Sequence, residues 1–308
     1  MKQINLEGVI PAAILPMNKD YEPDYKAFQN YIEWLVKEGA VAVAVNMDTG
    51  EGPQLSEEER ITVIKEARIA SKGRISVLSG VMGATTMAAA KSAEAYAKAG
   101  AEGLVVFPNA GFRNSPLDDR IPVDYHKAIA DSSGLPIVLF QLAPIFGGVL
   151  YSRETLLKLL EVPGVCAMKE ASFDAQMYTY TIDTLKMSSH KITLLTGNDL
   201  MITESLLLGA KGALLGVCAI GCGLVARMLR EFQCGHVEKA LEMRETVQNF
   251  AKVIYADPML DYRARAKVAL SLIGVISPDL TYVRPPMLQI DESGRKAIDA
   301  GLKAAGYK

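Results

Sequence analysis

Short apolar segments recur about every 30 residues through the first three quarters of the chain, and amphipathic segments of helical period separate them. Each apolar segment is nearly continuous, which is typical of parallel strands buried on both faces. Eight strands are therefore predicted, at Val9–Ile14, Val41–Val45, Ile75–Leu78, Leu104–Phe107, Ile137–Phe140, Val165–Met168, Ile192–Leu195 and Ala213–Val217.

The segments between these strands carry the signals that begin and end helices. One helix is predicted over Asp24–Glu38, where apolar residues recur on one face. Ser56 and Glu59 form a capping box at the start of the next. Glycine closes a helix before a strand at Gly39, Gly73, Gly100, Gly134, Gly164 and Gly209.

Eight strands alternating with helices in about 235 residues predict an α/β fold, the (β/α)8 TIM barrel. The alternative is a doubly wound open sheet, which would normally stop at fewer strands. It would also often carry a glycine fingerprint after the first strand. Here Pro16-Met17-Asn18 follows that strand, so the barrel is favoured.

The end of the chain reads as a C-terminal three-helix appendage on the barrel. Proline breaks these helices from one another at Asp257-Pro258, Ser277-Pro278 and Pro285-Pro286. We therefore predict a barrel at residues 1–235 and the appendage at 236–308.

Composition excludes several classes of protein. Half of the 308 residues are apolar and 22% are charged, which is typical of a globular chain. The formal net charge of −2 gives no basic excess for a nucleic-acid partner. The apolar runs are too short and glycine-broken to span a membrane, and Met1–Asn5 lacks an apolar signal region. We therefore expect a cytoplasmic protein.

The cysteines and histidines indicate no bound group. Cys166, Cys218, Cys222 and Cys234 fit neither a disulfide framework nor a zinc site, so we expect reduced thiols. The three histidines lie far apart in sequence, so no metal centre and no cofactor are predicted.

The active site of a barrel lies at the C-terminal ends of its strands, and one lysine stands out there. Lys169 directly follows the apolar run Val165–Met168. Burial of its stem should lower the pKa of the amine, and a neutral amine can attack a carbonyl to form a Schiff base. The alternative is a lysine that reaches solvent or pairs with Glu170.

A glycine-bearing turn follows the second predicted strand. Backbone N–H groups of Asp48-Thr49-Gly50-Glu51, with the Thr49 hydroxyl, could cradle a carboxylate. The alternative is an ordinary turn between a strand and a helix, in which Glu51 would only tie down the loop.

Several motifs together resemble those of the dihydrodipicolinate synthase and N-acetylneuraminate lyase superfamily of Schiff-base-forming barrels. The resemblance runs from Gly8 to about Gly306. It is carried by Thr49-Gly50-Glu51 with Pro53 and Leu55-Ser56-Glu57-Glu58-Glu59-Arg60, by Lys169-Glu170-Ala171-Ser172, by Gly197-Asn198-Asp199, by Gly209-Ala210-Lys211-Gly212 and by Ser293-Gly294-Arg295. It implies that Lys169 forms the imine, and that the protein is a homo-oligomer, either a dimer or a tetramer.

The chain departs from this family at several places, among them Leu15, which replaces a threonine of the opening strand. Phe140 replaces the family tyrosine that shuttles protons, and Asp48 replaces a threonine or serine. Asn109-Ala110 stand where the family often has a tyrosine pair, and the loop Ala143–Gly148 lacks the arginine of dihydrodipicolinate synthases. A phenyl ring cannot move a proton, so lysine biosynthesis is not expected. We predict that Asp48 takes over acid–base catalysis, with Asn109, Gln141 or a water as alternatives.

These residues predict a lyase of the aldolase or dehydratase type. It would act on a C–C or C–O bond of a small 2-oxo acid or related carbonyl compound. The predicted catalytic positions are Lys169, Asp48 and Phe140, and the predicted substrate-binding residues are Thr49, Gly50, Asn109 and Gln141. The apolar loop Leu142–Leu150 indicates a less polar partner than a dicarboxylate.

Two other functions stay open at this point. One is a catalytically silent relative that binds a carbonyl ligand or serves as a regulatory or structural subunit. The other is a metal-dependent aldolase, which would need histidines at the strand ends, where this chain has none.

Overall fold

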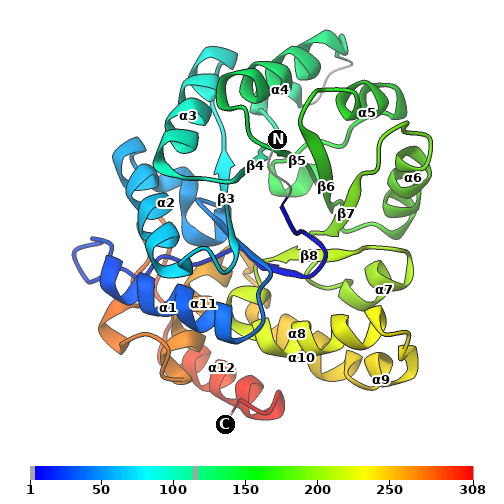
Figure 1. Cartoon of the computed structure of the whole chain (residues 1–308). Helices are drawn as coiled ribbons and strands as arrows, with labels where there is room; N and C mark the ends of the chain where they lie inside the picture. Colours follow the sequence, from blue (N-terminus) through cyan, green and yellow to red (C-terminus); the bar gives the residue numbers. More distant parts are fainter. Residues whose placement is uncertain (1–3, 114–116, 308) are drawn as a thin grey trace.

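The computed structural model describes residues 4–113 and 117–307, and its eight parallel strands form a ring with helices around it (Figure 1). From β2 to β8 each strand pairs with its neighbours in sequence, and β1 pairs with β8. The ring is completed by a parallel bridge between Ala12 and Ala44, beside the first and second strands. The strands are β1 (Val9–Pro11), β2 (Ala42–Val45), β3 (Ser76–Val81), β4 (Gly103–Val106), β5 (Ile137–Leu142), β6 (Val165–Ala171), β7 (Thr193–Thr196) and β8 (Gly212–Leu215). The predicted (β/α)8 barrel is confirmed.

Helices follow the strands as the sequence predicts. The Ser56–Glu59 capping box opens α2, and Gly39, Gly100 and Gly134 adopt the left-handed conformation after their helices. The barrel helices are α1 (Tyr25–Lys37), α2 (Glu57–Ser71), α3 (Thr86–Ala99), α4 (Arg120–Ser133), α5 (Arg153–Leu160), α6 (Ala175–Leu185), α7 (Ile202–Leu207) and α8 (Cys218–Gln233).

Alternation along the strands produces two apolar layers. One set of side chains fills the inside of the barrel, and includes Val138 and Phe140 of β5 and Leu195 of β7. The other set lies between the strands and the helices, and includes Leu139 of β5 and Met168 of β6. Inward and outward positions of one strand therefore meet different surroundings.

The C-terminal segment differs from the prediction at its first helix. That helix is divided at Met243 into α9 (Val237–Glu242) and α10 (Arg244–Ile254). Two further helices follow, α11 (Tyr262–Leu272) and α12 (Glu292–Ala304). Helices α10 and α11 pack on α8, and their apolar residues belong to the outer core layer of the barrel. The boundary at residues 235 and 236 stays a prediction.

The middle strands run farther than predicted. Strand β5 continues to Leu142 and β6 to Ala171, so Lys169 lies within a strand and not after one. Phe140 is in register with Lys169, and Gln141 with Glu170. The side chains of Phe140 and Lys169 therefore point into the barrel, and those of Gln141 and Glu170 point outward.

None of the helices in the described ranges is long and apolar enough to cross a bilayer.

Candidate active site

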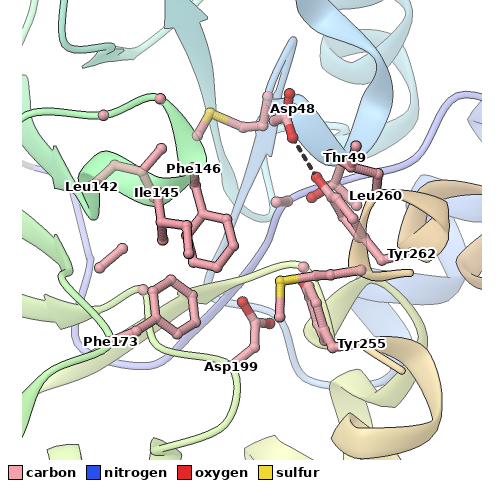
Figure 2. Close-up of a pocket in the computed structure, with 18 of the residues that line it drawn as sticks. Asp48, Thr49, Leu142, Ile145, Phe146, Phe173, Asp199, Tyr255, Leu260 and Tyr262 are labelled. Carbon is pink, nitrogen blue, oxygen red and sulfur yellow. Dashed lines mark hydrogen bonds between the residues drawn. The ribbon is translucent and has the colours of Figure 1, made fainter. Parts of the chain in front are cut away.

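A cavity of about 740 Å³ opens at the C-terminal ends of the strands (Figure 2). Its floor is formed by inward side chains of β5 and β6, and its walls by the loops after the strands. The segment between α10 and α11 closes one side. The residues that carry its chemistry are Asp48, Thr49, Arg113, Phe140, Lys169, Asp199, Tyr255, Tyr262 and Arg263.

Lys169 points into this cavity and is buried, with 8% of its surface exposed. Burial lowers the pKa of its amine to about 8, while the negative charges of Asp199 and Asp48 oppose that shift. About a tenth of the amine is therefore neutral at pH 7, far more than for an ordinary lysine, and imine formation requires this neutral form. The alternative pairing with Glu170 is wrong, because Glu170 points to the other side of β6.

Glu170 fixes the end of β6 from outside the barrel. The Asn198 side chain donates to its carboxylate at 2.8 Å and to its carbonyl oxygen at 3.0 Å. The Gln141 amide donates to the same carboxylate at 3.2 Å. These bonds hold the ends of β5, β6 and β7 together, and so hold the strand that carries Lys169.

Gly197 is required for the path of the lysine stem. A Cβ atom at this position would lie 2.8 Å from Cε of Lys169 and 3.0 Å from the carbonyl oxygen of Glu170. The lysine therefore runs directly over the chain that follows β7 and reaches the space beside Asp199.

Asp199 is the second buried charge of the cavity. Burial raises the pKa of its carboxyl to about 6, despite the N–H of Val217, the charge of Lys169 and the Tyr255 hydroxyl, which all lower it. Its Oδ1 accepts the Val217 N–H at 2.7 Å. The sequence singled out Gly197-Asn198-Asp199 only as a family motif and gave this carboxyl no role.

Asp48 lies at the cavity wall as predicted, and the structure gives its carboxylate two partners. The Tyr262 hydroxyl donates to Oδ2 at 2.7 Å (dashed in Figure 2), and the Arg263 guanidinium forms an ion pair with the same oxygen. Arg263 also donates to the Asp48 carbonyl oxygen at 2.8 Å. The negative charge beside the substrate turn is therefore compensated. This arrangement favours an anchoring role over the predicted acid–base role.

Glu51 ties down the same turn from behind. Its side chain is 1% exposed and accepts the Lys267 ammonium of α11 at 2.5 Å and the Arg284 backbone N–H at 2.8 Å. The structural role considered for this residue fits these contacts.

Thr49 lines the cavity, whereas Gly50 lies behind it. The Gly50 N–H donates to the Met47 carbonyl at 3.1 Å, so it is not available to an anion. A Cβ at Gly50 would also collide with the carbonyl oxygen of Ala13. The predicted binding role of Gly50 is thus reduced to allowing a close approach of two backbones.

Two predicted substrate-binding residues point away from the cavity. Gln141 lies on the outer face of β5 and donates to the Thr181 hydroxyl of α6 at 2.7 Å. Asn109 donates to the carbonyl of Gly83 at 2.7 Å and accepts the Gly111 N–H at 2.7 Å. Neither side chain lines the cavity, so the structure does not support contact of Gln141 or Asn109 with substrate.

One wall of the cavity is apolar. Phe140 packs edge-on against Phe107, and Phe146 against Phe173 with ring centres 5.1 Å apart. Figure 2 shows Leu142, Ile145 and the latter two rings on the side opposite Tyr255. Arg113 lies at the rim, with its guanidinium close to Gly147.

Sequence reasoning missed Tyr255, Tyr262 and Arg263 because they follow the barrel. The two tyrosine rings are stacked with centres 5.0 Å apart. The rule that searches strand ends cannot find residues of a C-terminal helix, and no local motif marks them.

Side chains of His, Cys, Asp and Glu do not gather in groups of three that could hold a metal ion anywhere in residues 4–113 and 117–307. A metal-free site stays a prediction.

Comparisons with known proteins agree on one relationship. A model of the "Dihydrodipicolinate synthetase family" matches residues 5–305. The 4-hydroxy-tetrahydrodipicolinate synthase of Sphingopyxis alaskensis is 30% identical over 301 residues, which cover 97% of this chain and 98% of that protein. The enzyme of the same name from Neisseria gonorrhoeae is 28% identical over 302 residues, or 98% and 99% of the two chains.

Solved structures of this type superpose on the whole chain. The dihydrodipicolinate synthase of Acinetobacter baumannii, described as complexed with pyruvate, gives a TM-score of 0.86 at 25% identity and covers 99% of this chain and 100% of that one. The synthase from Aquifex aeolicus gives 0.85 at 26% identity, over 97% and 98% of the two chains.

Proposed function

The chain belongs to the dihydrodipicolinate synthetase family of lysine-dependent lyases and aldolases, and we propose that it forms an imine between Lys169 and a small 2-oxo acid or related carbonyl compound. It would then form or break a C–C or C–O bond next to the former carbonyl. The observation that carries this proposal is the buried amine of Lys169, whose pKa is lowered to about 8 inside a cavity at the strand ends.

Pyruvate is the first compound to test. The A. baumannii synthase is described in complex with pyruvate, and Thr49 and Lys169 line the same cavity here. The Arg263 guanidinium compensates the negative charge of Asp48. The Asp48 carboxylate should therefore repel an anionic substrate less strongly than the sequence alone indicates.

We propose that the second substrate or leaving fragment is less polar than a dicarboxylate. Phe146 and Phe173 form an aromatic wall, and Ile145 is 85% exposed at the rim. The loop Ala143–Gly148 has no arginine of its own, although Arg113 lies at the rim beside it, and Phe140 has no hydroxyl. These residues argue against dihydrodipicolinate synthase activity. The relatives described above are 4-hydroxy-tetrahydrodipicolinate synthases and do not support excluding this activity, so the exclusion rests on the residues of the cavity alone.

The family also supports a homo-oligomer, a dimer or tetramer, as part of this proposal. The four free cysteines are compatible with a reducing compartment and support a cytoplasmic location.

Trapping with borohydride tests the central step. The protein is incubated with pyruvate, other 2-oxo acids and simple aldehydes, reduced, digested and examined by mass spectrometry. A stable added mass on the peptide that contains Lys169 is expected, and Lys169→Ala should abolish it while leaving the circular dichroism spectrum unchanged. No adduct with any carbonyl compound would favour the catalytically silent relative instead.

A further inference from the structure

We propose that Asp199, supported by the Tyr255 hydroxyl, removes and returns the proton on the carbon next to the Lys169 imine, in place of the hydroxyl that Phe140 lacks. This inference rests on the proposed imine at Lys169. It assigns the acid–base work to residues from the loop after β7 and from the segment after α10.

The backbone brings Asp199 and Lys169 together. Strand β7 pairs with β6, and Lys169 is in register with Leu195. Because Gly197 has no side chain, the lysine stem crosses the chain two residues before Asp199. Both side chains line the same cavity, and Figure 2 shows the Asp199 carboxyl directed into it between Phe173 and Tyr255.

The carboxyl is fixed on one oxygen and supported on its flank. The Val217 N–H holds Oδ1 at 2.7 Å, and the Gly216 N–H also helps to stabilise the ionised carboxyl. The Tyr255 hydroxyl helps to stabilise the ionised form of Asp199. The Tyr255 hydroxyl lies over Gly216, because a Cβ atom at that position would collide with it. The same Cβ position is 3.1 Å from the Thr49 hydroxyl.

The other titratable groups of the cavity suit this work less well. The charge of Asp48 is compensated by Arg263, and Asp257 is exposed at the rim. Burial raises the pKa of the Tyr255 and Tyr262 hydroxyls well above the ordinary value, so they stay protonated and donate hydrogen bonds. Among the described lining residues, Asp199 combines proximity to Lys169 with a pKa near neutrality, about 6.

The step balances without another reactant. The Asp199 carboxylate takes a proton from the carbon next to the protonated imine. The C–H electron pair forms a C=C bond, and the C=N electron pair moves to the nitrogen. The products are an enamine on Lys169 and a neutral Asp199 carboxyl. The reverse step returns a proton from this carboxyl to the carbon, and exchange of the carboxyl proton with solvent between the two steps brings deuterium into the substrate in D₂O.

Several charged or titratable groups face Asp199 and shape its pH dependence. They are Lys169 of β6, Cys218 at the start of α8, and Tyr255. Asp48 of the short 3-10 helix η1 (Asp48–Gly50) acts indirectly, through its charge on Lys169 and Tyr255. The positive charge of Lys169 and the Tyr255 hydroxyl both lower the pKa of Asp199. Removing the hydroxyl should therefore raise that pKa. Because only the ionised carboxylate accepts a proton, the exchange rate should then begin to fall at a higher pH when the solution is acidified.

The test separates imine formation from proton transfer. In D₂O, exchange of the pyruvate methyl protons is followed by NMR, and the imine is trapped by borohydride in parallel. Asp199→Asn should keep trapping within a few-fold of wild type and slow exchange by about 10²–10⁴-fold. Asp131→Asn, which neutralises an exposed carboxyl of α4 outside the cavity, is the matched control and should change neither.

Tyr255→Phe gives an independent readout, and it serves if Asp199→Asn does not fold. When the pH is lowered, its exchange rate should begin to fall at a higher pH than in wild type, while the trapped adduct persists. Exchange at the wild-type rate in Asp199→Asn, loss of trapping together with exchange in that folded variant, or an unchanged pH limb in Tyr255→Phe would each overturn the assignment. Absence of any adduct in the wild-type protein would instead refute the proposed function.

Discussion

The Lys169 amine lies 4.1 Å from the centre of the Phe140 ring, so an aromatic face borders the group that forms the imine. Two effects on the amine oppose each other there. Burial disfavours the ammonium and lowers the pKa to about 8, whereas the electron-rich face of the ring attracts a cation. The ring therefore tunes the lysine but supplies no proton.

The pH dependence of trapping should reveal the lowered pKa of Lys169. Since only the neutral amine attacks a carbonyl, the rate of adduct formation should rise with pH and reach half its maximum near pH 8. Below that value it should fall about tenfold per pH unit. The measurement is the initial rate of borohydride-trapped adduct between pH 6 and 10. A midpoint above pH 10 would show an unperturbed lysine.

Phe140→Leu should lower the pKa of Lys169 further. The ring stabilises the ammonium by about 0.5–2 kcal/mol, which corresponds to a change of roughly one pKa unit on its removal. The midpoint of the same trapping profile should move down by that amount. Phe140→Tyr keeps the ring and is the control, so its midpoint should stay near that of wild type. Equal midpoints of the trapping profile in the Phe140→Leu variant and in wild type would show that the contact between the ring and the amine has no energetic effect.

Condensation of pyruvate with aspartate semialdehyde should be negligible. Phe140 carries no hydroxyl, and the loop Ala143–Gly148 has no arginine for the aldehyde's carboxylate. Phe140→Tyr alone should not restore the reaction, because the loop is unchanged. A coupled assay for the condensation product tests both proteins. Rapid turnover by wild type would mean that these departures do not exclude the activity.

Asp48→Asn distinguishes anchoring from acid–base catalysis. The substitution keeps the shape and removes the charge that faces Arg263. If Asp48 anchors the turn, proton exchange into pyruvate should stay within a few-fold of wild type, and pyruvate should bind at least as tightly because Arg263 is released. If Asp48 is the acid–base group predicted from sequence, exchange should fall by about 10²–10⁴-fold while trapping persists.

Lys267→Met should destabilise the protein strongly. The Lys267 side chain is fully buried and forms an ion pair with Glu51 at 2.5 Å. Removing one partner leaves an uncompensated buried charge, which costs about 3–5 kcal/mol in the free energy of unfolding. The double variant Lys267→Met, Glu51→Gln should recover much of that loss. Urea unfolding measures both, and equal loss in the two variants would contradict this account.

The sequence by itself determined the barrel and its central lysine. Continuous apolar runs, the capping box at Ser56 and Glu59, and glycines such as Gly100 act over short distances, so a local pattern records them. The position of Lys169 after an apolar run was enough to predict a buried amine. The prediction placed the end of the strand too early, because the polar pair Lys169-Glu170 still continues β6.

Only the tertiary structure decided which groups surround that lysine. Alternation along the lengthened β5 turns Gln141 outward to Thr181, and this direction depends on the register with β6. Tyr262 meets Asp48 across 214 positions of sequence, and Lys267 meets Glu51 across 216. Such contacts depend on how the C-terminal helices pack on the closed barrel, and no periodicity or spacing within one segment encodes the distance between two segments.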